Sequence, residues 1–201
     1  VGTVIVHVGG ESLIADIGRG RYSKAYWGPE RYDLLVKSSR GHSVPIVNGY
    51  AQGGGRDYAA RVLEHAVGAA ADGEDRLVLA LEGAYPAEAG VAALTRTIAL
   101  HRRPPRGAVT LADCVRFAYG PGHLTSVITT FAPVAVGDGQ VRICGAHAAL
   151  QIDYDAGTIT VEVVTEPAVD FPAGPQAVNR ILFTLRVPAE EASIRLAIVP
   201  E

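Results

Sequence analysis

The chain has 201 residues, of which 48% are hydrophobic and 19% charged, and its formal net charge is −3. This length and apolar content suffice for a large core within one domain. The negative charge balance and the lack of a basic stripe argue against a nucleic-acid partner, and no apolar run is long enough to cross a bilayer. The sequence contains no methionine and begins directly on the apolar run Val1 to Val8, so we expect further sequence before residue 1.

Short runs of alternating apolar and polar side chains recur along the whole chain. This period of two is typical of strands that bury one face. The predicted strands, in chain order, span residues 4–8, 12–17, 43–47, 59–67, 76–82, 92–101, 108–117, 124–131, 140–144, 148–154, 158–164, 181–187 and 194–199. No segment has a sustained helical period. Residues 59–71 are rich in alanine, but Val62 and Val67 favour a strand over a helix there.

Turn signals separate the predicted strands. Gly9-Gly10 can adopt the positive φ angles of a tight hairpin turn, and Asp138-Gly139 is a second hairpin signal. Residues 102–107 contain two prolines, which cannot donate to a strand ladder, so we predict a turn there.

Two longer connections are predicted as loops. Residues 18–31 are polar and aromatic, and residues 167–175 are rich in proline. The whole pattern predicts one all-β domain over residues 1–201, an antiparallel two-sheet β-sandwich of about a dozen strands.

The stretch from residue 16 to residue 49 mixes aromatic rings with cationic side chains. Sugar-binding surfaces use both, because rings stack on the apolar faces of pyranoses and arginine pairs with carboxylates or sulfates. The candidate substrate-binding residues are Arg19, Arg21, Trp27 and Arg40. The other interpretation is a long loop that covers one end of the sandwich with its aromatic side chains tucked in. The composition fits both interpretations equally.

Asp16, at the end of a predicted strand, and His42, before another, are candidate metal ligands. Zinc accepts imidazole nitrogen and carboxylate oxygen, but a closed site normally needs at least three protein ligands. From these two residues alone, a capping aspartate and a hydrogen-bonded histidine are favoured over a metal site.

The two cysteines, Cys114 and Cys144, can form one disulfide if their strands are neighbours. Free buried thiols are the favoured interpretation for so few cysteines, and the sequence leaves the cellular location open.

Three segments carry a resemblance to a known family. They are GESLIADIG at residues 10–18, SSRGHSV at residues 38–44 and VNG at residues 47–49. They resemble the G-x-x-L-I-x-D-x-G and S-T-R-x-H-N-x-x-x-V-D-G strands at the start of the C-terminal β-sandwich domain of heparinase II/III-like proteins. Ser43 is a departure, because the family usually has asparagine at that position.

Members of this family are polysaccharide lyases that cleave uronic-acid-containing glycans by β-elimination, in a cleft between an N-terminal α/α-toroid and the sandwich. The resemblance therefore implies an acidic polysaccharide as substrate and a toroid domain of the same protein as partner. It implies that residues 1–201 are the sandwich domain, truncated at its N-terminal edge and inactive alone. A non-catalytic carbohydrate-binding or scaffolding sandwich is the alternative.

The resemblance also implies roles for particular residues. The family's sandwich commonly holds zinc through two histidines and an aspartate, and Asp16 and His42 match the aspartate and the later histidine. The remaining ligand belongs to a His-x-His pair expected just upstream of residue 1, so zinc is implied as a cofactor with an incomplete site in this chain. The tyrosine that a sandwich offers to the catalytic cleft is expected in the predicted loop 18–31, where Tyr22 and Tyr26 are the candidates.

Overall fold

The strands of the molecule form two large antiparallel sheets and one hairpin. The computed structural model describes residues 1–69, 73–102 and 106–201. The strands are β1 (Val6–Val8), β2 (Glu11–Ile14), β3 (Ile46–Val47), β4 (Arg61–Ala66), β5 (Glu74–Ala80), β6 (Val91–His101), β7 (Ala108–Phe117), β8 (Leu124–Thr130), β9 (Val134–Gly137), β10 (Gln140–Cys144), β11 (Ala149–Asp153), β12 (Ile159–Phe171), β13 (Gly174–Leu185) and β14 (Glu191–Pro200). The larger sheet has the order β4-β5-β6-β7-β14-β11-β10-β9, and the smaller has the order β12-β13-β8-β3.

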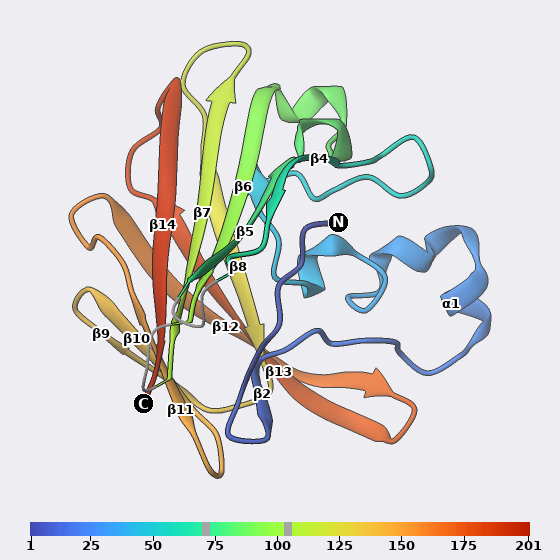
Figure 1. The fold of residues 1–201 in the computed structure, drawn as a ribbon. Coiled ribbons are helices and arrows are strands. Elements are labelled where there is room, and N and C mark those ends of the chain that lie inside the picture. The colour runs from blue at the N-terminus through green and yellow to red at the C-terminus, as the bar shows by residue number, and fades with distance from the viewer. Residues whose placement is uncertain (70–72, 103–105) are drawn as a thin grey trace.

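The two sheets pack face to face around a hydrophobic core, which confirms the predicted all-β sandwich (Figure 1). Leu94, Leu111 and Leu196 contribute from the eight-stranded sheet, and Ile128 and Phe183 contribute from the four-stranded sheet. Each of these side chains is at most 1% exposed. Their neighbours along the strands point away from the core, as the period of two requires.

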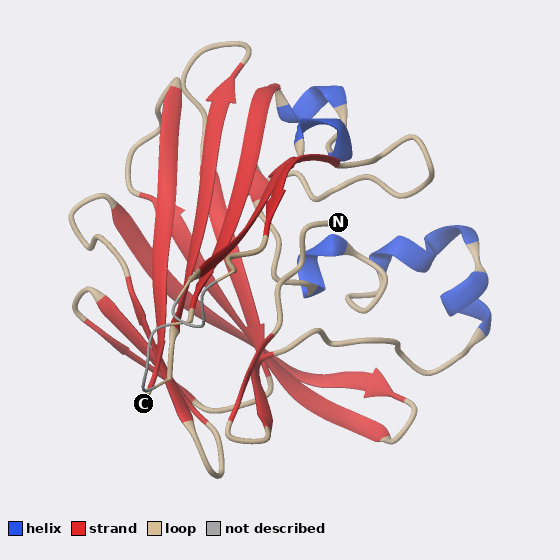
Figure 2. Ribbon diagram, viewed as in Figure 1, coloured by secondary structure: helices blue, strands red, loops and turns tan. Residues whose placement is uncertain are grey.

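The helices are short and lie outside the sheets, on one side of the sandwich (Figure 2). They are α1 (Lys24–Trp27) and the 3-10 helices η1 (Pro29–Asp33), η2 (Ser39–Gly41), η3 (Glu82–Ala84) and η4 (Ala87–Ala89). In the described part of the chain, no helix has the length and apolar character that a membrane crossing needs.

The segment predicted as a loop at residues 18–31 is partly helical. The Ser23 hydroxyl accepts a hydrogen bond from the backbone N–H of Tyr26 at 3.2 Å, which caps α1. Pro29 then opens η1, where its missing N–H costs nothing. These local capping signals are the physical reason why the segment folds into two short turns of helix.

β12 and β13 form one long hairpin, so the prediction of a loop at residues 167–175 is wrong. β12 continues to Phe171 and β13 begins at Gly174. Pro167 is accommodated because β12 is the edge strand of its sheet and its register shifts between Glu166 and Val169. The hairpin therefore extends beyond the main sandwich, next to the segment that carries α1 (Figure 1).

Other differences from the predicted strands are smaller. β9 was not predicted, although the predicted turn at Asp138-Gly139 connects it to β10. The strand predicted at residues 43–47 is reduced to β3, because the Ser43 hydroxyl accepts a hydrogen bond from the backbone N–H of Thr129 at 3.0 Å instead of joining a ladder. The strand predicted at residues 76–82 ends at Ala80.

The predicted Gly9-Gly10 turn is confirmed, with φ angles of 59° and 88°. In the predicted turn at residues 102–107, residues 103–105 lie outside the described part of the chain. Both cysteines are free thiols, and Cys114 is exposed rather than buried. β7 and β10, which carry Cys114 and Cys144, are separated in the sheet by β14 and β11.

Candidate functional site

Asp16 and His42 lie in contact although 26 residues separate them. The Nδ1 atom of His42 is 2.9 Å from the Oδ2 atom of Asp16, and the side chains are 23% and 24% exposed. The other carboxylate oxygen of Asp16 accepts a hydrogen bond from the backbone N–H of Gly18 at 2.7 Å. The two residues that the sequence singled out as candidate metal ligands are thus brought together at the surface.

The pKa of Asp16 is lowered from its ordinary value. Partial burial opposes ionisation of this carboxyl, but hydrogen bonds from the Gly18 N–H, His42 and the Thr3 side chain, together with the charge of His42, outweigh it. Asp16 is therefore a carboxylate at neutral pH, which is the form that a cation or an imidazolium requires.

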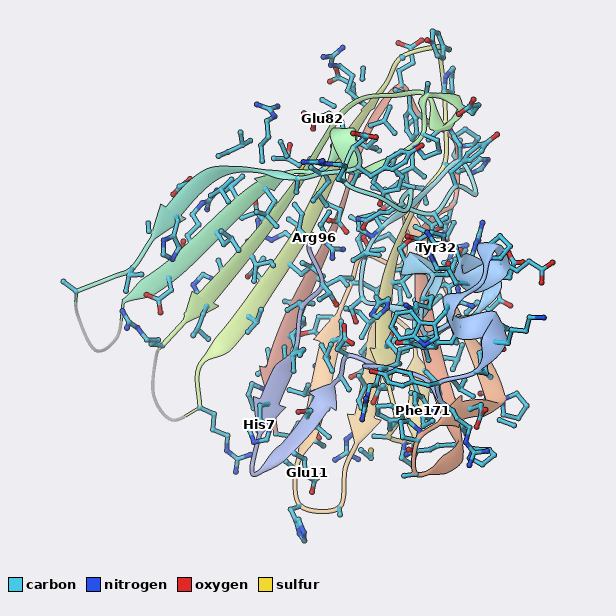
Figure 3. All side chains as sticks on the ribbon, turned by 90° about the vertical axis from the view of Figure 1, so that its right-hand side faces the viewer. His7, Glu11, Tyr32, Glu82, Arg96 and Phe171 are labelled. Atoms are coloured by element: carbon cyan, nitrogen blue, oxygen red, sulfur yellow. The ribbon has the colours of Figure 1, made fainter. Side chains whose placement is uncertain are left out.

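A buried arginine binds the backbone next to His42 and the backbone near the start of the chain. Nη1 of Arg96 donates to the carbonyl of Gly2 at 2.8 Å and to the carbonyl of Ser43 at 2.6 Å. Nε and Nη2 of Arg96 donate to the two carboxylate oxygens of Asp113, each at 2.7 Å, and both side chains are fully buried. Figure 3 places Arg96 in the interior of the sandwich. Since Ser43 follows His42, this fork holds the histidine in place.

Further hydrogen bonds anchor the same stretch to β8 and to the segment between η3 and η4. The buried hydroxyl of Tyr85 donates to the carbonyl of Pro45 at 2.6 Å. The Thr129 hydroxyl donates to the carbonyl of Gly41 at 3.3 Å. The site is therefore built on rigid elements, although neither Asp16 nor His42 lies within a strand.

The Asp16–His42 pair offers the nitrogen and oxygen donors that zinc prefers, so the donor chemistry fits this metal. Within the described residues, no group of three or more His, Cys, Asp and Glu side chains is gathered closely enough to hold a metal ion. The present contacts are those of a capping aspartate and a hydrogen-bonded histidine. The carboxylate of Asp16 faces the Nδ1 atom of His42, so a metal held by both side chains would take the place of the proton that now joins Nδ1 to Oδ2.

Three of the candidate residues form an aromatic cluster, which comprises Tyr22, Tyr26 and Trp27. The ring centroids lie 5.0 Å apart for Tyr22 and Tyr26, 5.4 Å for Tyr22 and Trp27, and 5.1 Å for Tyr26 and Trp27. Tyr26 is only 7% exposed, whereas Tyr22 is 56% and Trp27 65% exposed. One ring of the aromatic cluster is therefore tucked in, and the other two face the solvent.

Two cations are attached to the aromatic cluster. Nη1 of Arg19 donates to the Tyr22 hydroxyl at 2.8 Å, and its guanidinium lies 5.0 Å from the Tyr22 ring centroid. Nζ of Lys37 lies 4.0 Å from the centroid of Tyr26 and 4.8 Å from that of Trp27. Sequence reasoning missed Lys37, because ten residues separate it from Trp27 and only the fold of the segment brings them together.

A cavity of ≈ 440 Å³ lies behind the aromatic cluster, between its segment and the β12–β13 hairpin. Tyr26 and Arg21 line it on one side, and Glu166 and Asp170 line it on the other. The backbone N–H of Arg21 donates to the carbonyl of Asp170 at 2.9 Å, which closes the segment onto the hairpin. In Figure 3, Phe171 lies below the helices of this segment, and Tyr32 lies on one of them, η1.

Arg40 lies apart from the aromatic cluster. Its Nη2 atom donates to the carbonyl of Gly49 at 2.7 Å and so braces the turn after β3. The structure thus joins Asp16 to His42 and Arg19 to the aromatic cluster, and it gives Arg40 a separate contact.

Charge is distributed unevenly along the chain. Residues 18–61 contain eight arginines and lysines and only three aspartates and glutamates, whereas the rest of the chain contains ten and eighteen. Five of the eight tyrosines and the single tryptophan also lie within residues 18–61. The net charge of −3 therefore conceals a cationic and aromatic segment, which suits an anionic ligand.

No protein-family model matches this chain, and no curated protein matches it in sequence. Among solved structures, the chain is similar to a crystal structure of a mutant of the heparan sulfate lyase HepC from Pedobacter heparinus. The TM-score is 0.72 at 15% sequence identity, and the match covers 99% of this chain and 30% of that chain. The likeness shows a shared fold over almost all of the chain, which corresponds to less than a third of the lyase.

Proposed function

We propose that this chain is the β-sandwich domain of a lyase that cleaves uronic-acid-containing polysaccharides by β-elimination. In this proposal a further domain, an α/α-toroid, completes the catalytic cleft, and residues 1–201 alone are inactive. The fold shared with a heparan sulfate lyase supports the proposal. The observation that carries it is the exposed pair of rings, Tyr22 and Trp27, beside the cations Arg19 and Lys37.

The chemistry defines what such a cleft must supply. A base removes the proton from the carbon α to the uronate carboxylate, and the electron pair left behind forms the new carbon–carbon double bond. The bond to the glycosidic oxygen breaks, and that oxygen takes up a proton from an acid. Cations or hydrogen-bond donors must offset the charge that develops on the carboxylate.

We assign the side chains of this segment to parts of that task. Arg19, Arg21 and Arg40 bind carboxylate or sulfate groups of the glycan, and Trp27 stacks on a sugar ring. Tyr22 is the tyrosine that we assign to proton transfer, because Tyr22 is exposed while Tyr26 is almost fully buried. Tyr26 instead supports the rings of its neighbours.

We further propose that Asp16 and His42 hold a zinc ion together with a third ligand from outside this chain. When bound, zinc stabilises the fold at this edge of the sandwich and fixes the two side chains. Asp16 would supply a charged oxygen and His42 its Nδ1 atom, in place of the hydrogen bond that the two side chains now make.

A second candidate function is a non-catalytic carbohydrate-binding sandwich. The same exposed rings favour it, since stacking on a sugar needs no second domain. The two candidates differ in what residues 1–201 do alone, because a binding module retains glycan affinity without any catalytic partner.

The experiment compares the longer protein that carries this chain with residues 1–201 alone on a panel of uronate glycans. The ultraviolet absorbance of the unsaturated product should rise with the longer protein and stay flat with residues 1–201. Glycan binding by residues 1–201, without cleavage by the longer protein, would favour the binding module. If neither cleavage by the longer protein nor glycan binding by residues 1–201 occurs across a broad panel, both candidate functions are refuted.

A further inference from the structure

One edge of the eight-stranded sheet is open. β4 lies at that edge, and β5 is its only partner among the described strands. All six residues of β4 are exposed to solvent. The side of β4 that faces away from β5 carries backbone N–H and C=O groups that no described strand covers. Such an edge is a template for pairing with another chain.

The side chains on this edge are unusually apolar for a fully exposed strand. Val62 is 64% exposed and Leu63 is 54% exposed, and Val67, just beyond the end of β4, is 66% exposed. Apolar side chains gathered on an open edge favour association, because pairing removes them from water while it satisfies the backbone.

The charges on β4 indicate which partner fits. A bulge between Val62 and Glu64 shifts the register, so that Arg61 lies opposite Ala80 and Glu64 lies opposite Val78. Ala80 and Val78 are two residues apart on β5 and share one face of the sheet, so Arg61 and Glu64 share that face as well. β4 therefore presents one cation and one anion on the same face, on either side of an apolar pair.

This arrangement is self-complementary. If two β4 strands pair antiparallel with Val62 opposite Leu63 of a second copy, Arg61 lies opposite Glu64 of that copy. The two-fold symmetry repeats the same pair on the other side of the axis. Within one chain, Arg61 contacts Glu82 at 2.7 Å and Glu64 contacts Arg76 at 3.3 Å. The side chain of Arg61 is 70% exposed even with this contact to Glu82. Its remaining N–H donors can therefore reach a second carboxylate.

We propose that two copies of this chain associate through their β4 edges in a two-fold symmetric, antiparallel pair. The pairing joins the two eight-stranded sheets into one continuous sheet. It uses none of the residues assigned to glycan or zinc, so it is independent of the proposed function.

Sedimentation equilibrium of residues 1–201, up to a concentration of about 1 mM, tests the proposal. The expected result is a reversible dimer. In a dimer of either single variant, Arg61→Glu or Glu64→Arg, residues 61 and 64 carry the same charge at both symmetry-related contacts. Each variant should therefore raise the dimer dissociation constant about tenfold or more. An equimolar mixture of the two variants restores both opposite-charge pairs and should associate as tightly as the unchanged chain.

Arg116→Glu on β7 is the matched control, because it makes the same charge change at an exposed arginine away from the edge. It should leave the dissociation constant unchanged. Circular dichroism checks that each variant is folded, and recovery in the mixture is itself proof of folding. A monomer at every concentration would overturn the proposal. So would a dimer that neither single variant weakens, or a mixture no tighter than the separate variants.

Discussion

The guanidinium of Arg96 donates to the backbone carbonyl of Ser43 at 2.6 Å, one residue after His42. The same group donates to Gly2, one residue before the threonine whose side chain hydrogen-bonds Asp16. This buried side chain lies on β6 and thus links the chain start and the His42 segment to the eight-stranded sheet. The geometry of the Asp16–His42 pair depends on this link.

Removal of Arg96 should therefore destabilise the fold strongly. Arg96→Met leaves the Asp113 carboxylate buried without its partner, and we expect a loss of about 3–5 kcal/mol in the free energy of unfolding. The double variant Arg96→Met, Asp113→Leu removes both charges, so it should lose less than the sum of the two single variants. Urea denaturation of the four proteins measures the coupling. Additive losses would contradict the assigned pairing.

Asp16 should make stability dependent on pH in the acid range. Its pKa is lower in the folded chain than in the unfolded chain, so its contribution is full above the unfolded value of about 4 and is lost as the pH falls through the folded value. Asp16→Asn should cost about 1 kcal/mol at neutral pH, and the difference from the unchanged chain should shrink below pH of about 4. Urea denaturation of both proteins, from neutral pH down to acid pH, measures this difference in the free energy of unfolding. A difference that does not vary with pH would contradict the ionised, hydrogen-bonded carboxylate.

Trp27 should contribute to glycan binding and little to stability, because its side chain is 65% exposed. Trp27→Ala should weaken binding of an acidic oligosaccharide about tenfold, since loss of an aromatic contact costs roughly 1 kcal/mol or more. Tyr119→Ala is the matched control, because Tyr119 is 87% exposed and lies outside residues 18–61. Titration calorimetry measures the affinity of each variant for the acidic oligosaccharide. Equal weakening by the two substitutions would argue against a specific surface at the aromatic cluster.

The β1–β2 turn should tolerate substitution of Gly10 better than substitution of Gly9. Both have positive φ angles, so an alanine at either should cost about 1 kcal/mol. A Cβ atom at Gly9 would lie 2.9 Å from the Cβ atom of Ala148, whereas nothing lies within 4 Å of one at Gly10. Gly9→Ala should therefore lower the melting temperature more than Gly10→Ala. The reverse order would show that the turn packs differently.

The fold was largely predictable because alternation is a local signal. Leu94, Leu111 and Ile128 lie on predicted strands and occupy the core. The β12–β13 hairpin was not predictable, because nothing local shows that Pro167 lies on an edge strand with a shifted register.

The site was predictable only in its residue types. Asp16 and His42 could be selected as a pair, but their 2.9 Å contact depends on long-range anchors such as Arg96. The contact of Lys37 with Trp27 depends likewise on how the whole segment folds.

We propose that this sandwich belongs to an enzyme that cleaves glycans by elimination. Mass spectrometry of the products, after digestion of a uronate polysaccharide by the longer protein, tests it most directly. We expect oligosaccharides with an unsaturated end, each lighter by one water than the corresponding hydrolysis product. Tyr22→Phe should strongly reduce their yield, and Tyr119→Phe should not. Saturated products of hydrolysis, or a polysaccharide left intact across the whole panel, would contradict it.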